Sequence, residues 1–204
     1  MVKKKALISV GIIFFILIVD QILKIWVKTN MTLGEEINIF GDWFKLHFIE
    51  NEGMAFGFVF FQGYFGKLLL TTFRLIASGF IVWIIYKMIK TYVSTGLIVS
   101  MSLICAGAIG NIVDCVFYGK IFSISNYYLP TAELFPTSGG YAPFLQGKVV
   151  DMLQLDLFTI GSFNFFPAIF NIADASITVG LFILIAFFYK PLSAFVTSFE
   201  KRNV

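Results

Sequence analysis

Residues 94–114 read STGLIVSMSLICAGAIGNIVD, an apolar run that ends in two polar residues, Asn111 and Asp114. A helix that spans a membrane needs about 20 mostly apolar residues, and this run meets that requirement without a charge before Asp114. Three further segments, residues 6–27, 68–86 and 167–189, are also long and apolar enough. The sequence therefore predicts an all-α membrane protein with four transmembrane helices.

The composition of the whole chain supports this interpretation. Of its 204 residues, 58% are hydrophobic and 13% are charged, whereas a soluble domain carries about 25% charged residues. A soluble protein of this size could not hide so much apolar surface, which excludes a soluble enzyme or a disordered chain. A nucleic-acid surface is excluded because Lys3, Lys4 and Lys5 form the only basic block. We expect one integral membrane domain over residues 1–204.

The basic residues predict an orientation, because Lys and Arg are enriched in the short cytoplasmic flanks of membrane spans. The first apolar run lacks a small-x-small cleavage site, so we interpret it as an uncleaved anchor. One side of the membrane then receives Lys3, Lys4, Lys5, Lys87, Lys90, Lys190, Lys201 and Arg202. Both termini are predicted to be cytoplasmic, and the loops 28–67 and 114–166 are predicted to face outward.

The two outer loops differ in character. Residues 44–48 alternate apolar and polar side chains, which predicts a strand, and Ile37 and Ile39 suit a facing strand. His47 falls on the polar face, and we interpret it as a solvated strand residue rather than a catalytic base. The second loop is rich in Pro, Gly and aromatic residues, which predicts a small folded region at the membrane interface.

Polar residues within apolar spans are costly and are therefore candidates for function. The predicted orientation places three polar clusters at one depth, near the outer leaflet. They are Asp20, Gln21 and Lys24 in the first span, Asn111 and Asp114 in the third, and Asn171 and Asp174 in the fourth. The spacing of Asp20 and Lys24 suits a helical ion pair, which either fixes helix packing or serves the site. Arg74 in the second span is expected to reach outward or to pair with an acid.

Asp151 follows a short apolar, strand-like piece just before the fourth span. If it folds back to the outer end of the bundle, Asp114, Asp151 and Asp174 are all candidates for a carboxylate pair. Two carboxylates held close in a low dielectric cannot both ionise easily, so one keeps a proton and the pair divides acid and base roles. This is the chemistry of aspartic peptide hydrolysis, and we expect no metal and no cofactor, because the single His forms no triad and no residues have zinc-site spacing.

Five motifs in order resemble the lipoprotein signal peptidase family, the type II signal peptidases of bacteria. Asp20, Gln21 and Lys24 resemble its D-Q-x-x-K. The other four are NEGMAFG at residues 51–57, GAIGNIVD at 107–114, VVD at 149–151 and FPAIFNIADASI at 166–177, the last with one extra residue before Phe170. The resemblance covers most of the chain.

The resemblance implies an aspartic endopeptidase in the bacterial cytoplasmic (inner) membrane, with its active site at the outer leaflet. Its substrate would be a diacylglyceryl prolipoprotein, cut just before the lipidated cysteine, and its other partner would be membrane lipid. The residues that match the catalytic pair are Asp151 and Asp174. Supporting or substrate-binding positions would be Asn111, Asp114, Asn171, Asn51, Gly53, Asp20 and Lys24. We expect a monomer.

Two departures from the family pattern stand out. Most members have Arg directly after the Asp of G-N-x-x-D, whereas this chain has Cys115. A role of that Arg toward substrate or lipid is either absent here or supplied by another residue, such as Lys120 or Lys148. Gly119 and Gly147 both resemble the glycine before V-V-D, which indicates an insertion between them. We hypothesise that this insert, residues 120–146, shapes or covers the mouth of the site.

Two other functions are possible for a small membrane protein with acids in its spans. An intramembrane protease of the presenilin kind would need a G-x-G-D motif, which the chain lacks. A four-helix carrier could bind cations at the outer acidic cluster, but the sequence shows no inverted repeat or broken helices.

Overall fold

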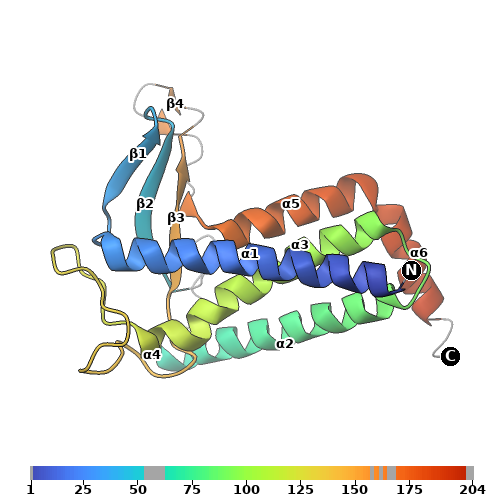
Figure 1. Ribbon diagram of the computed structural model, residues 1–204, viewed down its shortest axis with the longest axis horizontal. Helices are drawn as coiled ribbons and strands as arrows, with labels where there is room; N and C mark the ends of the chain where they lie inside the picture. The colour runs from blue at the N-terminus through green and yellow to red at the C-terminus, as the bar shows by residue number, and fades with distance from the viewer. Residues whose placement is uncertain (1, 53–62, 157–158, 161–162, 165–168, 201–204) are drawn as a thin grey trace.

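A computed structural model describes residues 2–52, 63–156, 159–160, 163–164 and 169–200. Long helices run side by side, and a small sheet projects from one end of this bundle, roughly at right angles to the helices (Figure 1). The helices are α1 (Val2–Asn30), α2 (Tyr64–Ile89), α3 (Thr95–Val113) and α5 (Ile172–Phe187). We call the two ends of the bundle the sheet end and the far end.

The helical membrane character predicted from the sequence is confirmed. α1, α2 and the helical stretch Thr95–Ile121 are each long and apolar enough to cross a membrane. α5 has only 16 residues, about 24 Å of helix, which is shorter than the roughly 30 Å hydrocarbon core. It bends by 82° into α6 (Tyr189–Glu200), so the described residues give three spans, or four if this bent pair is one span.

The ends of the predicted spans are only partly correct. Residues 6–27 and 68–86 lie inside α1 and α2, and Ser94 is the N-cap of α3, with its side chain accepting from the Leu97 amide at 3.3 Å. The fourth helix was predicted from residue 167, but α5 begins at Ile172, because Asn171 before it has an extended backbone and caps the helix. Residues 165–168 lie outside the described part of the chain.

The sheet joins the two loops that were predicted to face outward. Its order is β1 (Glu36–Phe40), β2 (Phe44–Asn51), β3 (Val149–Leu155) and β6 (Ile169–Phe170), all antiparallel. The predicted strand over residues 44–48 is part of β2, and its predicted partner is β1. A separate hairpin pairs β4 (Thr159–Ile160) with β5 (Phe163–Asn164). Because β3 pairs with β2 and leads through β6 into α5, the sheet places both loops against the helices.

Close helix contact in the bundle depends on small residues. A Cβ atom at Gly107 of α3 would lie 2.1 Å from the carbonyl oxygen of Ala173 on α5. A Cβ at Gly180 of α5 would lie 2.9 Å from the carbonyl oxygen of Ser100. Small residues let the backbones of membrane helices approach closely, so α3 and α5 pack closely at two levels, one beside their polar ends and one nearer the far end.

The insert folds back on itself at the sheet end. After α3 the chain forms a π-helical turn, η2 (Asp114–Tyr118), and a short helix, α4 (Gly119–Ile121). The Ala142 amide donates to the Gly119 carbonyl at 2.9 Å and the Gly147 amide to the Cys115 carbonyl at 2.8 Å, so the two ends of the insert meet. Thr131 Oγ1 also donates to the carbonyl of Thr29 in α1, at 2.9 Å.

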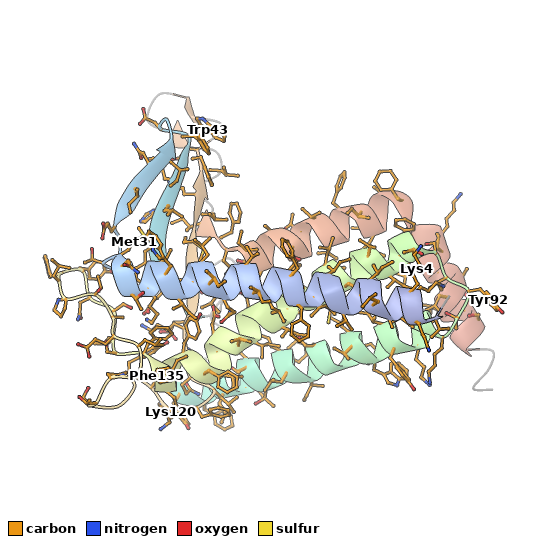
Figure 2. All side chains as sticks on the ribbon, viewed as in Figure 1. Lys4, Met31, Trp43, Tyr92, Lys120 and Phe135 are labelled. Atoms are coloured by element: carbon orange, nitrogen blue, oxygen red, sulfur yellow. The ribbon has the colours of Figure 1, made fainter. Side chains whose placement is uncertain are left out.

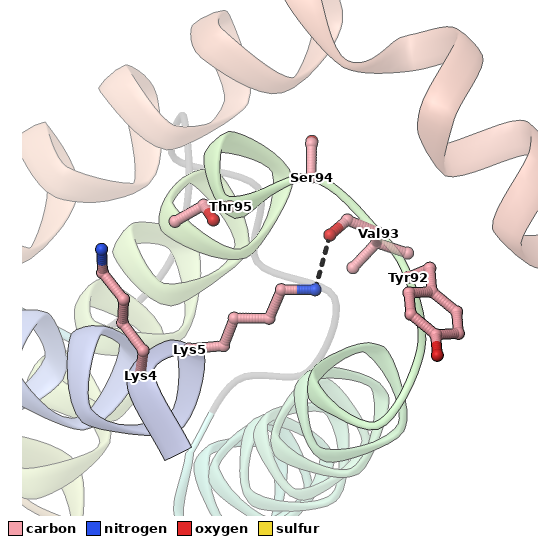
Figure 3. A pocket seen from close by; sticks show the side chains of 6 residues that line it. All are labelled: Lys4, Lys5, Tyr92, Val93, Ser94 and Thr95. Atoms are coloured by element: carbon pink, nitrogen blue, oxygen red, sulfur yellow. Dashed lines mark hydrogen bonds between the residues drawn. The ribbon is translucent and has the colours of Figure 1, made fainter. Parts of the chain in front are cut away.

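Basic residues mark the far end. Figure 2 places Lys4 and Tyr92 there, and Met31, Lys120 and Phe135 at the sheet end. The buried Lys5 donates from Nζ to the carbonyls of Val93, at 2.7 Å, and Thr91, at 3.1 Å, which ties α1 to the α2–α3 connection (Figure 3). A cavity of about 460 Å³ beside Lys5 is lined by Lys4, Lys5, Tyr92, Val93, Ser94 and Thr95.

Candidate active site

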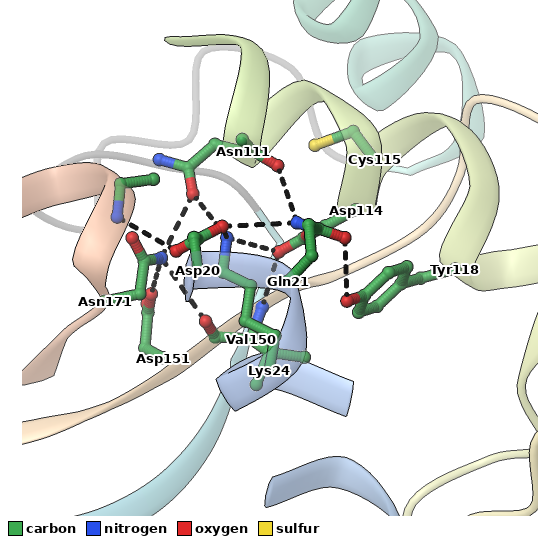
Figure 4. Close-up of polar contacts among 12 residues, drawn as sticks. Asp20, Gln21, Lys24, Asn111, Asp114, Cys115, Tyr118, Val150, Asp151 and Asn171 are labelled. Atoms are coloured by element: carbon green, nitrogen blue, oxygen red, sulfur yellow. Dashed lines mark hydrogen bonds and ion pairs between the residues drawn. The ribbon is translucent and has the colours of Figure 1, made fainter. Parts of the chain in front are cut away.

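The three polar clusters meet at the sheet end of the bundle, where α1, α3, α5 and β3 come together (Figure 4). Hydrogen bonds and ion pairs join all four elements. The clusters that the sequence placed at one depth are in direct contact with one another.

A buried triad of charges lies between α1 and the end of α3. Lys24 Nζ is 2.9 Å from Asp20 Oδ2 and 2.8 Å from Asp114 Oδ2, and all three side chains are fully buried. Asp20 also accepts the Ala173 amide at 2.9 Å, and Asp114 accepts the Val150 amide at 3.2 Å. The predicted Asp20–Lys24 ion pair is therefore present, and its acids also hold the backbones of α5 and β3.

Gln21 links this triad to Tyr118. Its Nε2 donates to Asp114 Oδ1 at 2.9 Å, and its Oε1 accepts from the Tyr118 hydroxyl at 3.1 Å. The motif contained Gln21, but sequence reasoning gave it no role. Nothing in the sequence pointed to Tyr118, which follows from the π-helical turn that directs η2 toward α1.

The two N-x-x-D patterns have different backbone settings. Asn111 is in the last turn of α3, and Asp114 begins η2. Asn171 instead precedes α5 and forms a capping box with Asp174: its Oδ1 accepts the Asp174 amide at 2.8 Å, and Asp174 Oδ2 accepts the Asn171 amide at 3.4 Å. Such a box satisfies free amides at a helix start and fixes both side chains.

Asn111 connects the charged triad to Asp174. Its Nδ2 donates to Asp174 Oδ1 at 2.7 Å, while its Oδ1 accepts from Lys24 Nζ at 3.0 Å. The same oxygen accepts from Asn171 Nδ2, also at 3.0 Å. Because Lys24 and Asn171 both donate to Oδ1, the amide of Asn111 must present its NH2 group to Asp174.

Asp151 on β3 lies beside this group. Its Oδ1 accepts from Asn171 Nδ2 at 2.7 Å, and its Oδ2 accepts from Asn51 Nδ2 at 3.2 Å. Burial, followed by the nearby Asp174 carboxylate, raises the pKa of Asp151 to about 7, against the opposing effect of the two amide donors and Lys24. Asp151 is 4% exposed, whereas Asp174 is half-buried. The two carboxyl groups thus share Asn171 but differ in their access to water.

The structure distinguishes the three acids that were candidates for the carboxylate pair, because their side chains have different partners. Asp114 is held by Lys24 and Gln21, whereas Asp151 and Asp174 are joined through Asn171. Asn51 contacts Asp151, and Gly53 lies outside the described residues. His47 is bonded to Gln154, with its Nδ1 2.6 Å from Oε1, away from the acids. No group of three or more His, Cys, Asp or Glu side chains could hold a metal ion in the described part of the chain.

The cation beside Cys115 is Arg74 of α2, which belongs to none of the five motifs. Arg74 Nη1 of α2 lies 3.8 Å from Cys115 Sγ. The two lysines considered from the sequence are placed differently: Lys148 faces Glu50 and Glu52, at 3.8 and 3.5 Å, and Lys120 is exposed. Arg74 was expected to reach outward or pair with an acid, and its contact with Cys115 was not foreseen.

Comparisons with known proteins agree with this arrangement. A family model described as "Signal peptidase (SPase) II" matches residues 12–190. A lipoprotein signal peptidase of Porphyromonas gingivalis is 41% identical over 195 residues, which cover 90% of this chain and 83% of that protein. One from Amoebophilus asiaticus is 36% identical over 188 residues, covering 86% of this chain and 75% of that protein.

Solved structures show the same fold. A bacterial membrane enzyme determined by the in meso method at 2.3 Å resolution superposes with a TM-score of 0.62 at 24% identity, covering 91% of this chain and 90% of that one. A second such structure, at 1.9 Å resolution, gives a TM-score of 0.59 at 25% identity and covers 87% and 89% of the two chains.

Proposed function

This chain belongs to the signal peptidase II family, and from that premise we propose that it is an aspartic endopeptidase that removes the signal peptide from diacylglyceryl prolipoproteins. It cuts just before the lipidated cysteine. The observation that carries this proposal is that Asn171 contacts both acids: its side-chain amide donates to Asp151 Oδ1, and its backbone amide donates to Asp174 Oδ2. The alternative of a cation carrier gains no support, because Lys24 already lies between Asp20 and Asp114 and pairs with both.

The two carboxyl groups divide the work according to their surroundings. Asp151 is the more buried, and with its pKa raised to about 7 it holds the shared proton. Asp174 is half-buried, receives the Asn111 amide and lies in the first turn of α5, where the helix dipole favours a negative charge. Asp174 is therefore the general base and Asp151 the general acid.

The reaction then follows from these two states. Asp174 takes a proton from water while the water oxygen attacks the scissile carbonyl carbon, and Asp151 gives its proton to the carbonyl oxygen. The resulting gem-diol collapses as its C–N bond breaks: Asp174 gives its proton to the amide nitrogen, and Asp151 takes a proton back from a gem-diol hydroxyl. The products are the carboxyl end of the signal peptide and the free amino group of the lipidated cysteine.

The other site residues support this pair. Asn111 and Asn171 fix the two carboxyl groups, and the Asp20–Lys24–Asp114 triad fixes Asn111 and the amide of Val150. Asn51 orients Asp151 by donating to its Oδ2. No metal or cofactor takes part in these steps.

The membrane setting completes the proposal. The sheet end faces the outside of the cytoplasmic membrane, and the far end, with Lys4 and Lys5, faces the cytoplasm, as the positive-inside rule requires. The acids then lie at the outer leaflet, where the diacylglyceryl chains of a substrate would anchor the bond to be cut.

The test replaces each acid by its amide. Asp151→Asn and Asp174→Asn are each expected to lower the single-turnover cleavage rate of a diacylglyceryl precursor by about 10³-fold or more, because each removes one member of a pair that acts as a unit. Asp42→Asn, in the exposed β1–β2 turn, is the matched control and should cleave like the unmodified protein.

Two results would contradict the proposal. One is wild-type cleavage by either amide variant when the variant still unfolds at the wild-type temperature. The other is the failure of the unmodified protein to cleave the diacylglyceryl precursor at all.

A further inference from the structure

A second buried ion pair lies outside the proposed active site. Lys28, in the last turn of α1, pairs with Glu50 of β2, and their side chains are 0% and 4% exposed. Lys28 Nζ also donates to Ser125 Oγ at 2.7 Å, and Ser125 Oγ donates to Glu50 Oε1 at 2.8 Å. A buried pair of this kind is stable only when further hydrogen bonds and close geometry offset the loss of water.

The insert supplies the surroundings of this pair. Ser125 belongs to it, as do Phe122 and Tyr141, whose ring centroids lie 5.3 and 5.0 Å from Lys28 Nζ. Cations are attracted to the faces of aromatic rings at such distances. Phe122 is fully buried and packs in the same core cluster as Phe48 of β2. The insert therefore encloses Lys28 and Glu50 and binds them directly.

This pair adjoins the proposed site through the chain itself. Glu50 directly precedes Asn51 in β2, and neighbouring side chains of a strand point to opposite faces. Glu50 points to the insert, and Asn51 points to Asp151, donating to its Oδ2. In the sheet, Glu50 pairs with Val150 and Asn51 with Val149, so the position of β2 sets the distance from Asn51 to Asp151.

We propose that the insert is a positioning element for Asn51, which acts through the buried Lys28–Glu50 pair, rather than a cover over the site. The proposal rests on the role of Asp151 in the proposed function. Besides Glu50 and Lys28, the insert contacts α1 through Thr131 and η2 through Leu145, whose amide donates to the Val116 carbonyl at 3.2 Å.

The groups around Asp151 determine how a displacement of Asn51 would change the pKa of Asp151. Asp174 on α5 raises the pKa of Asp151, whereas Lys24 on α1 and the amides of Asn51 and Asn171 lower it. Asp114 faces the neighbouring Val150 amide, and Glu50 and Lys28 lie on the opposite face of the sheet. Weakening the Asn51 hydrogen bond removes a donor to the charged form, so Asp151 would keep its proton to higher pH.

The test is a double-mutant cycle between Ser125 and Asn51, with kcat/KM for a diacylglyceryl precursor measured across pH. Ser125→Ala is expected to lower kcat/KM about fivefold and to move the alkaline limb of the pH profile upward by about half a pH unit, as Asn51→Ala does more strongly. In the Asn51→Ala background, Ser125→Ala should change kcat/KM by less than about 1.5-fold, because the residue it acts through is gone.

Controls separate positioning from a general loss of stability. Lys45→Gln breaks the Lys45–Glu36 pair, 3.3 Å long, on the same hairpin but away from the insert, and should leave the pH profile unchanged. If Glu50→Gln folds, it should lower kcat/KM and shift the alkaline limb in the same direction as Ser125→Ala, and by more. If Glu50→Gln does not fold, Ser125→Ala alone tests the positioning role.

An unchanged pH profile in Ser125→Ala, or additive losses in the double variant, would overturn the positioning role. Full activity of Asp151→Asn would instead overturn the proposed function itself, so the two failures are distinguishable.

Discussion

Asp151 and Asp174 are identical in chemistry and differ only in what surrounds them. Asp151 is almost completely buried on a strand, and Asp174 is half-buried at the start of a helix. Asn171 donates to both carboxyl groups, from its side-chain amide to Asp151 and from its backbone amide to Asp174, and so holds them near each other. At the scale of single residues, this difference in environment is the basis for the acid and base roles in the proposed mechanism.

The first prediction at this scale concerns pH. Burial, followed by the Asp174 charge, raises the pKa of Asp151 to about 7, and the proposed mechanism needs Asp151 protonated. Raising the pH through this value removes that proton, so kcat/KM for a diacylglyceryl precursor should fall above about pH 7, approaching tenfold per pH unit. Steady-state assays from pH 5 to 9 check this, and a profile that stays flat above pH 7 would rule out Asp151 as the acid.

At the scale of elements, the site depends on the close approach of α3 and α5. Gly107 makes this approach possible, and Asn111 follows it by one helical turn and reaches Asp174. The capping box at the start of α5 fixes the other side of the contact. The distance between α3 and α5 at Gly107 therefore affects the Asn111–Asp174 contact, which lies within one helical turn of it.

A second prediction tests this coupling. In Gly107→Ala the new Cβ would lie 2.1 Å from the Ala173 carbonyl oxygen, so the helices must separate, and overpacking of this kind costs about 1–3 kcal/mol. We expect kcat/KM to fall at least about tenfold, because a shift of about 1 Å between reacting groups has effects of this size or greater.

Gly11→Ala in α1 is the matched control for this prediction. Among the described residues, no atom outside the adjoining backbone of α1 lies within 4 Å of its added Cβ, and Ala is the better helix former. Thermal unfolding should show equal or greater stability for Gly11→Ala and lower stability for Gly107→Ala. Wild-type kcat/KM in Gly107→Ala would mean that the contact does not set the geometry of the site.

At the scale of the whole molecule, the N-terminal lysines and the proposed active site lie at opposite ends of the bundle. The far end carries Lys4 and the buried Lys5, and the sheet end carries the acids, the sheet and the insert. A bundle oriented with the far end in the cytoplasm would place the acids at the outer leaflet. The proposed substrate, anchored there by its lipid, would then lie beside the site.

A third prediction follows for the intact membrane. In a chain with Cys105 and Cys115 replaced by Ala, Tyr128→Cys at the sheet end should react with a membrane-impermeant maleimide in spheroplasts, and Tyr92→Cys at the far end should react only after the membrane is opened. Both side chains are highly exposed, at 83% and 98%, so access depends on the side of the membrane. The reverse labelling pattern would invert the proposed orientation.

Much of the architecture was predictable because it depends on local patterns. Runs of apolar residues long enough to cross a bilayer predicted α1, α2 and α3, and alternation predicted β2. The start of α5 was misplaced because apolar composition does not distinguish an extended approach from helix, and the bend into α6 was not foreseen for the same reason.

Span length and motif order are properties of the chain, so the amino-acid sequence was enough to predict a membrane protein, the polar residues that meet at one end of it, and the family that it resembles. Only the tertiary structure separated Asp114 from Asp151 and Asp174, brought Arg74 to Cys115, and paired Lys28 with Glu50 beneath the insert. These contacts join residues from different elements, and their free energy comes from burial and partner geometry that local sequence does not encode.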